Sequence, residues 1–219
     1  MIISPSLLNS NICEIKENLK IIEHAGAKYL HIDVMDGNFV PLQAFGGNTV
    51  SDIKQHTHLM LDVHLMISNP QQHLDEYKDA DIITIHVEST NHLYRCIQYI
   101  KKLGIKAGVA INPGTSIYMI EEVLPIVDQV LVMSVNPAML GERFIEQTVS
   151  KIAKLKKLKE KNNLSFDIEV DGNINDKTIV PCITSGANVF VSGSYIFKDG
   201  NPEMKIKKLL RLSECSKIE

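Results

Sequence analysis

Short apolar runs alternate with longer segments of helical periodicity from one end of the chain to the other. The apolar runs have the length of buried strands, and the segments between them place apolar residues at the i, i+3 and i+4 positions of amphipathic helices. Gly26, Gly104 and Gly186 stand at helix-to-strand junctions, where helices commonly end. The predicted strands are Ile2–Ser6, Tyr29–Met35, Met60–Met66, Ile82–Glu88, Lys106–Asn112, Gln129–Asn136, Phe166–Asp171 and Val189–Ser194, and the predicted helical segments include Ile12–Ala25, Pro70–Asp79, Leu93–Leu103, Ile117–Leu124 and Phe144–Lys161.

Strands that alternate with helices predict a parallel sheet, because parallel neighbours need a crossover connection. The 219 residues allow about 27 residues for each of eight units, which suits closure into a (β/α)8 TIM barrel. An open doubly wound sheet is the alternative, but it would normally carry a nucleotide-binding loop after its first strand, and Ser4–Leu8 is not such a loop. No linker or low-complexity tract interrupts the pattern. We therefore expect one α/β domain, a single TIM barrel over residues 1–219.

Polar residues break the apolar pattern near the carboxyl ends of several predicted strands. Strands of a parallel barrel are buried on both faces, so such residues are unusual there. Side chains alternate along a strand, which puts His31, Asp33 and Met35 on one face of theirs. The same alternation groups Asp62, His64 and Met66, then Asp167, Glu169 and Asp171, and further polar residues on these strands are Ser4, Ser6, His86, Glu88 and Asn112.

If those faces point inward, two or more histidines and several acids meet at one end of the barrel. Burying ionised carboxylates is costly unless they are paired, hydrogen-bonded or bound to a metal. A hydrogen-bonded core residue is the simpler interpretation of any one of these histidines, but their common position at strand ends favours a site. One metal ion with two imidazole and two carboxylate ligands would satisfy the group. Zinc suits this ligand set best, with iron, manganese or cobalt as alternatives.

Glycine-containing turns follow the last two predicted strands, at Asp171–Asn175 and Ser192–Tyr195. In TIM barrels the loops after the seventh and eighth strands commonly hold a substrate phosphate through backbone N–H groups. Elsewhere such a glycine is an ordinary turn residue. In this architecture the two turns predict a phosphate site.

Composition and charge exclude other classes of function. The chain is 44% hydrophobic and 22% charged with a net charge of −3, and the lysines of Lys151–Lys161 alternate with apolar residues as on a solvated helix face. We therefore expect no nucleic-acid partner. No apolar run approaches the roughly 18 residues that a membrane span needs. Four scattered cysteines without a CxxC motif, and a strand-like start at Met1–Ser4, lead us to expect reduced thiols in a cytoplasmic protein.

Several of these stretches together resemble the ribulose-phosphate 3-epimerase family, which includes allulose-6-phosphate 3-epimerases. They occur in family order and cover nearly the whole chain. The segment His31–Pro41 is very specific to the family. The matching stretches are Ser4–Leu7, His31–Pro41, Leu61–Met66, Ile111–Pro113, Met133–Pro137, Glu169–Gly172 and Gly193–Ser194.

The resemblance implies a metal-dependent isomerase that interconverts D-ribulose 5-phosphate and D-xylulose 5-phosphate by moving a proton at carbon 3. It also implies a homo-oligomer, since relatives are commonly dimers or hexamers. By resemblance, the metal ligands are His31, Asp33, His64 and Asp171; Asp33 and Asp171 are also the acid–base pair; Ser6 and His64 contact the substrate; Met35 and Met66 line the reacting face; and Gly141, Gly172, Gly193 and Ser194 bind the phosphate.

The expected chemistry removes a proton beside a ketone and returns one to the opposite face. A carboxylate with a pKa of about 4 is a weak base for this step, so a metal that stabilises the enediolate as a Lewis acid fits the requirement. Asp33 and Asp171 lie on the second and seventh predicted strands, from which they could face each other across the barrel mouth. Met35 and Met66 would shield the intermediate from water.

The loop before Phe144 departs from the family pattern. Ala138 and Leu140 replace two glycines, which adds Cβ atoms where backbone approaches the ligand. Glu142 replaces a glutamine and would repel a phosphate unless Arg143 offsets its charge. These departures leave the choice of ketose phosphate open.

Three alternatives follow. D-Allulose 6-phosphate is a second candidate substrate that the resemblance implies, and Asn173, which stands where a second glycine is common, is a further departure that leaves the substrate open. A non-catalytic sugar-phosphate binding protein is the rival from another class, although both aspartates and both histidines are retained. A Schiff-base aldolase or a phosphate-dependent decarboxylase on the same barrel is disfavoured, since both need a lysine at the end of a strand and Lys106 opens its strand.

Overall fold

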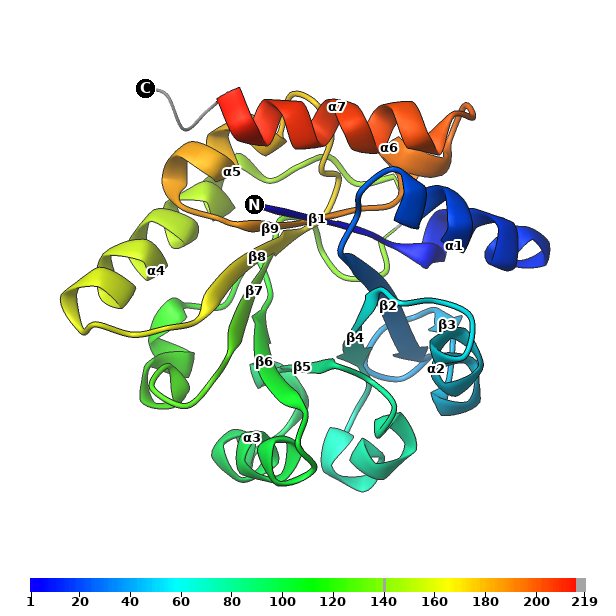
Figure 1. The fold of residues 1–219 in the computed structure, drawn as a ribbon. Helices are drawn as coiled ribbons and strands as arrows, with labels where there is room; N and C mark the ends of the chain where they lie inside the picture. Colours follow the sequence, from blue (N-terminus) through cyan, green and yellow to red (C-terminus); the bar gives the residue numbers. More distant parts are fainter. Residues whose placement is uncertain (140, 216–219) are drawn as a thin grey trace.

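Parallel strands close into a barrel in the computed structural model, which describes residues 1–139 and 141–215, with side chains up to residue 213 (Figure 1). Nine strands of this part form one sheet in the order β1-β9-β8-β7-β6-β5-β4-β2-β3, parallel except for the β2–β3 pair. A parallel bridge between Ser6 and His31 joins β1 to β2 and closes the sheet. The predicted TIM barrel is confirmed. The strands are β1 Ile2–Pro5, β2 Tyr29–Asp36, β3 Gln43–Ala44, β4 Met60–Met66, β5 Ile82–His86, β6 Lys106–Ile111, β7 Gln129–Met133, β8 Asp167–Asp171 and β9 Val189–Ser192.

Helices surround the barrel on its outer side (Figure 1). Among the described residues no helix is both long enough and apolar enough to span a bilayer. The α-helices are α1 Ile15–His24, α2 Gly47–Lys54, α3 Leu93–Lys102, α4 Val149–Lys161, α5 Ile179–Ser185, α6 Ser194–Phe197 and α7 Pro202–Cys215, and the 3₁₀ helices are Leu7–Asn9, Ile12–Glu14, Pro70–Gln72, Leu74–Tyr77, Val87–Ser89, Ile117–Val123 and Glu146–Thr148.

Two predicted helical segments are 3₁₀ instead of α. Pro70–Asp79 contains two short 3₁₀ helices, and Ile117–Leu124 contains one. The buried residues of the latter, Ile117, Ile120 and Val123, are spaced by three, which matches three residues per turn rather than 3.6. The spacing of these apolar residues is thus compatible with the tighter helix.

Element ends also differ from the sequence expectation. The α-helical part of Phe144–Lys161 begins only at Val149, and the strand predicted to reach Asn136 ends at Met133. Glu88 and Asn112 lie just beyond their strands, in connecting segments. Helices α2, α5, α6 and α7 were not among the predicted helical segments. The polar residues after each strand therefore belong to the loops above the barrel, where binding residues of TIM barrels lie.

The core lies between the outer faces of the strands and the helices. Ile32 and Val34 of β2 are 0% and 2% exposed and belong to this layer, with Ile97 and Ile100 of α3. The side chains that alternate with these two along β2 point into the barrel. Cys13, Cys96 and Cys182 are free thiols, as the sequence predicts, and Cys215 has its side chain outside the described part.

Candidate active site

The register of β2 against β4 places the polar residues of these strands side by side. In this parallel pair His31 is opposite Asp62, Asp33 is opposite His64, and Met35 is opposite Met66. His31 and His64 are fully buried, and Asp33 is 4% exposed. Period-two alternation therefore builds a polar interior toward the carboxyl end of the strands, topped by two methionines.

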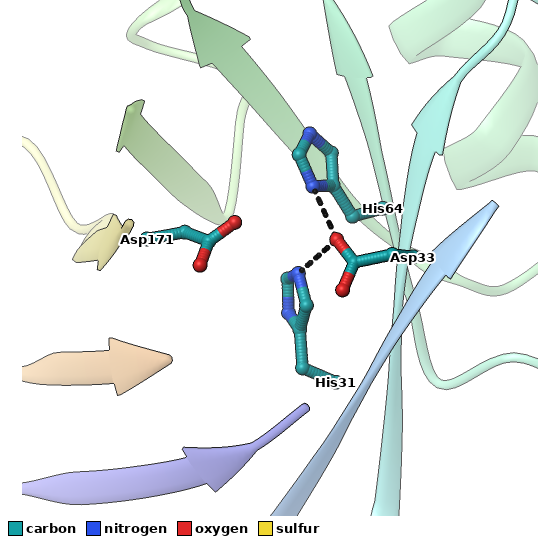
Figure 2. Close-up of side chains that lie close together, drawn as sticks. All are labelled: His31, Asp33, His64 and Asp171. Atoms are coloured by element: carbon teal, nitrogen blue, oxygen red, sulfur yellow. Dashed lines mark hydrogen bonds and ion pairs between the residues drawn. The ribbon is translucent and has the colours of Figure 1, made fainter. Parts of the chain in front are cut away.

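Four side chains from three strands meet there (Figure 2). His31 and Asp33 come from β2, His64 from β4, and Asp171 from the end of β8. Each offers a ligand atom, and these atoms all lie within 4.8 Å of one another. Asp33 Oδ1 is central, at 3.4 Å from His31 Nε2 and 3.3 Å from His64 Nδ1. The predicted metal ligands are thus brought together around one point.

The imidazoles are oriented as metal ligands would be. His31 Nε2 is buried and has no hydrogen-bond partner among the described residues, while its Nδ1 lies 2.8 Å from Asp62 Oδ2. His64 turns Nδ1 toward Asp33 and places Nε2 2.8 Å from His86 Nε2. A ligating histidine almost always has its second nitrogen held in this way. The donor set of two nitrogens and two carboxylates fits a divalent cation.

The two aspartates of the cluster have opposite pKa shifts. Burial opposes ionisation of Asp33, but the positive charge of His31, 3.4 Å away, and the contact with His64 outweigh it, so the pKa of Asp33 is lowered. Burial and the negative charge of Asp33 raise the pKa of Asp171 to about 7. Environments that separate two carboxyl pKa values in this way are typical of acid–base pairs.

Ser6 fixes the orientation of Asp33. Its hydroxyl donates a hydrogen bond of 2.7 Å to Asp33 Oδ2, the oxygen that does not face the histidines. Ser6 lies at the end of β1, where the bridge to His31 joins β1 to β2. The resemblance predicts that Ser6 contacts the substrate. In the structure Ser6 also contacts Asp33.

A polar layer lies beneath the cluster. Gln129 of β7 donates hydrogen bonds of 3.1 Å to Asp62 and 2.6 Å to Glu169. Asp62 and Glu169 are fully buried. Burial and the charge of Asp62 raise the pKa of Glu169 well above its ordinary value, whereas His31 lowers the pKa of Asp62 against the effect of burial. Glu169 is therefore neutral and Asp62 is the ionised partner of His31.

An open cavity covers the cluster at the barrel mouth. His31 and His64 lie below its surface and do not line it. The cavity is lined by the other predicted site residues, Ser6, Asp33, Met35, Met66, Gly141, Asp171, Gly172, Gly193 and Ser194.

Two glycines at the cavity have no room for a side chain. Gly172 has a φ of +122°, and a Cβ there would lie 2.7 Å from the backbone nitrogen of Val135. A Cβ on Gly193 would lie 2.5 Å from Asn9 Oδ1. Close approach of neighbouring segments thus explains both glycines, which also line the cavity.

The loop that departs from the family pattern adopts the conformation that glycine favours. Ala138 has a φ of +60° and Asn173 a φ of +50°. Glu142 turns back onto its own loop, where its carboxylate accepts hydrogen bonds of 2.6 Å and 2.8 Å from the backbone and side-chain nitrogens of Asn136. These partners hold the carboxylate in place and lower the pKa of Glu142, so its negative charge remains at the cavity. Leu140 lies outside the described residues.

Some residues of the cavity were not predicted. Met133, at the end of β7, is 2% exposed and lines the cavity beside Met35 and Met66. Period two along Gln129–Met133 would have placed it inward. Lys177 and Lys198 also line the cavity, from the segments that follow β8 and β9. No pattern distinguishes them from other surface lysines of the chain.

Comparison with known proteins finds a family that matches most of the chain. Residues 2–197 match the Ribulose-phosphate 3 epimerase family. The chain is 45% identical over 201 residues to the chloroplastic ribulose-5-phosphate-3-epimerase of Arabidopsis thaliana, covering 90% of this chain and 72% of that protein. It is 40% identical over 213 residues to the ribulose-phosphate 3-epimerase of Aquifex aeolicus (strain VF5), covering 96% of each.

Solved structures of similar fold have more distant sequences. KGPDC from Streptococcus mutans in complex with D-R5P has a TM-score of 0.76 at 15% identity, covering 97% of each chain. 3-Keto-L-gulonate-6-phosphate decarboxylase from Vibrio cholerae has a TM-score of 0.73 at 13% identity, covering 98% of this chain and 97% of that chain. At such identities the likeness concerns the fold alone.

Proposed function

The chain belongs to the ribulose-phosphate 3-epimerase family and is an isomerase, and from this premise we propose that Asp33 and Asp171 are its proton-transferring pair. The reaction inverts carbon 3 of a pentulose phosphate, converting D-ribulose 5-phosphate to D-xylulose 5-phosphate and back. The observation that carries the proposal is the meeting of two aspartates and two histidines at the floor of the mouth cavity.

Asp33 and Asp171 divide the proton transfers between them. In the metal-free protein the pKa of Asp33 is lowered and that of Asp171 is raised to about 7, which supports Asp33 as the acceptor of the proton from carbon 3 and Asp171 as the residue that returns one. Asp171 then donates its proton to the opposite face of the flat enediolate. In the reverse direction the roles exchange, so the pair ends each turnover with one proton still shared between the two residues.

His31, Asp33, His64 and Asp171 would hold one divalent cation, through His31 Nε2, His64 Nδ1 and a carboxylate oxygen of each aspartate. We propose zinc first, with iron, manganese and cobalt as alternatives that the same donors accept. When bound, such a cation supplies Lewis-acid stabilisation of negative charge on the substrate oxygens. Without it, a carboxylate is a weak base for a carbon acid.

The methionines exclude water from the reacting carbon. Met35, Met66 and Met133 line the cavity next to Asp33 and Asp171 and are at most 5% exposed. A thioether offers no acidic proton, so these side chains cover the enediolate without protonating it. This arrangement keeps proton return under the control of Asp171.

The phosphate is proposed to bind on the side of the cavity that the loops after β7, β8 and β9 form. Gly141, Gly172, Gly193 and Ser194 present backbone there. Lys177 and Lys198 add positive charge to the same cavity. The complex of a same-fold protein with D-R5P supports a sugar phosphate as ligand of this barrel mouth.

The deciding experiment separates metal, substrate and proton chemistry. The protein is treated with a chelator, reloaded with zinc, iron, manganese or cobalt, and assayed on D-ribulose 5-phosphate and D-allulose 6-phosphate in deuterated water. We expect activity to vanish with the metal and to return on reloading, with deuterium at carbon 3 and preference for the pentulose. Full activity in the metal-free protein, or product without deuterium, would overturn the proposal, and preference for the hexulose would reassign the substrate.

A further inference from the structure

The two histidines of the cluster are held differently. His31 Nδ1 meets the carboxylate of Asp62 directly, at 2.8 Å. His64 Nε2 instead meets a second imidazole, that of His86 at the end of β5, at 2.8 Å. The two ring planes make an angle of 24° and their centroids are 4.9 Å apart, so the rings meet edge to edge through these nitrogens. The metal ligand set does not require this second ring, so its role needs its own explanation.

The contact between the rings continues to a carboxylate. His86 Nδ1 lies 3.1 Å from Glu88 Oε2, and Glu88 Oε1 accepts a hydrogen bond of 2.8 Å from the backbone N–H of Asn112. His86 is fully buried, and the ring of Phe39 covers it at a centroid distance of 5.0 Å. A fixed chain of contacts thus leads from His64 through His86 and Glu88 to the loop after β6.

Hydrogen positions along this chain follow from the first contact. If His64 Nδ1 faces the cation, a neutral His64 carries its hydrogen on Nε2. Since two nitrogens 2.8 Å apart need one hydrogen between them, His86 Nε2 is the acceptor. His86 then carries its hydrogen on Nδ1, where Glu88 accepts it. Each of the two imidazoles then has one donor nitrogen and one acceptor nitrogen. The reversed arrangement would leave Nδ1 of His86 without a hydrogen for Glu88.

We propose that His86 and Glu88 are positioning residues that fix the tautomer and ring orientation of His64 as a metal ligand. The inference rests on the proposed metal site. The two oxygens of Glu88 receive His86 Nδ1–H and Asn112 N–H, so the carboxylate joins the ligand to the loop after β6. Lys151 of α4 anchors that loop, donating hydrogen bonds of 2.7, 2.7 and 2.6 Å to the carbonyl oxygens of Asn112, Pro113 and Thr115.

Glu88→Gln tests the carboxylate without changing its size. An amide has only one oxygen, so either His86 or Asn112 would face an N–H₂ group. We expect the affinity for Zn²⁺, measured on the full chain by competition with a chelator, to fall about 10- to 100-fold. Glu76→Gln is the matched control, because Glu76 accepts a 2.8 Å contact from His73 Nδ1 in an exposed pair. The control should bind Zn²⁺ as the wild type does.

His86 variants separate hydrogen bonding from packing. His86→Gln keeps an acceptor for His64 Nε2–H and is expected to lose less Zn²⁺ affinity than His86→Leu, which only fills space. Long-range ¹H–¹⁵N spectra of the zinc-loaded wild type give a second readout that needs no variant. They should show hydrogen on Nε2 of His64 and on Nδ1 of His86.

The outcomes test the metal site and the relay separately, where the relay is the chain of contacts from His64 through His86 to Glu88. If the wild type binds no Zn²⁺, the proposed metal site fails and the relay fails with it. If the wild type binds Zn²⁺ but Glu88→Gln and His86→Leu bind it equally well, or the spectra show hydrogen on Nε2 of His86, only the relay is overturned. A His86→Leu protein that does not fold leaves Glu88→Gln and the spectra to decide.

Discussion

Asp33 and Asp171 offer carboxylate oxygens within 4.8 Å of each other, from strands β2 and β8 that are not neighbours in the sheet. Proximity of two buried acids makes simultaneous ionisation costly, which is one reason why their pKa values move apart. Asp33 is in contact with two histidines, which lower its pKa. The negative charge of Asp33 raises the pKa of Asp171. This asymmetry supports the proposed division into a base, Asp33, and an acid, Asp171.

Replacement of either aspartate should therefore stop the reaction. Asp33→Asn and Asp171→Asn each remove one proton carrier, and we expect kcat to fall by at least about 10²- to 10⁴-fold. Asp52→Asn, at an exposed position of α2, is the control and should leave kcat unchanged. A coupled assay measures the rate, and circular dichroism checks the fold. Turnover near the wild-type rate in either site variant would contradict the two-acid scheme.

The hydroxyl of Ser6 should matter to the rate because it holds Asp33. Ser6→Ala leaves Asp33 Oδ2 without its 2.7 Å hydrogen bond, and we expect kcat/KM to fall about 10- to 100-fold, as for loss of a bond to a charged group. Ser4→Ala is the matched control on the same strand, since Ser4 Oγ is buried without a partner among the described residues. Equal effects of the two substitutions would show that the contact with Asp33 is unimportant.

Gly172 should tolerate no side chain. Gly172→Ala places a Cβ 2.7 Å from the backbone of Val135 at a φ of +122°, and we expect a loss of about 3 kcal/mol or more in the free energy of unfolding. Gly104→Ala measures the cost of a positive φ alone, because Gly104 has a φ of +80° and open space around its Cβ position. That control should cost only about 1–2 kcal/mol. Urea unfolding measures both, and similar losses would mean that the contact with Val135 relaxes freely.

The barrel and the floor of its site could be predicted from the sequence because both depend on period-two alternation. That alternation placed His31 and Asp33 on one face of β2, and the parallel register then brought His64 beside Asp33. Roles of individual residues came instead from the resemblance. The 3₁₀ helix at Ile117–Val123 was missed because spacings of three and of 3.6 differ little over seven residues.

The rim of the site could not be predicted, since it depends on loop conformations without a periodic signal. Glu142 is held by Asn136 only because the loop turns through Ala138 at a positive φ, which is unusual for alanine. Lys177 and Lys198 reach the cavity through the path of the loops after β8 and β9. Their positions follow from tertiary structure, and the residues themselves are ordinary surface lysines.

The polar layer below the site makes a prediction about pH and stability. Burial and the charge of Asp62 raise the pKa of Glu169 well above 4.5, its ordinary value, so the folded protein holds a proton there that the unfolded chain has released. When the folded state binds more protons, the free energy of unfolding falls as pH rises. The fall begins above the unfolded pKa and continues until the folded pKa is passed, with a slope of up to about 1.4 kcal/mol per pH unit for one proton.

Glu169→Gln should remove this part of the pH dependence. Glutamine has the shape and neutrality of the protonated acid and can keep the 2.6 Å hydrogen bond from Gln129 through its oxygen. We expect the variant to match the wild type near pH 4.5 and to become progressively more stable than it toward pH 8, in urea unfolding of the metal-free protein. Glu121→Gln, at an exposed position, should follow the wild-type curve. Parallel curves for Glu169→Gln and the wild type would mean that Glu169 is ionised in the folded protein. In that case Glu169 adds a second negative charge to that of Asp62 beneath His31, and the charge balance below the metal ligands must be assigned differently.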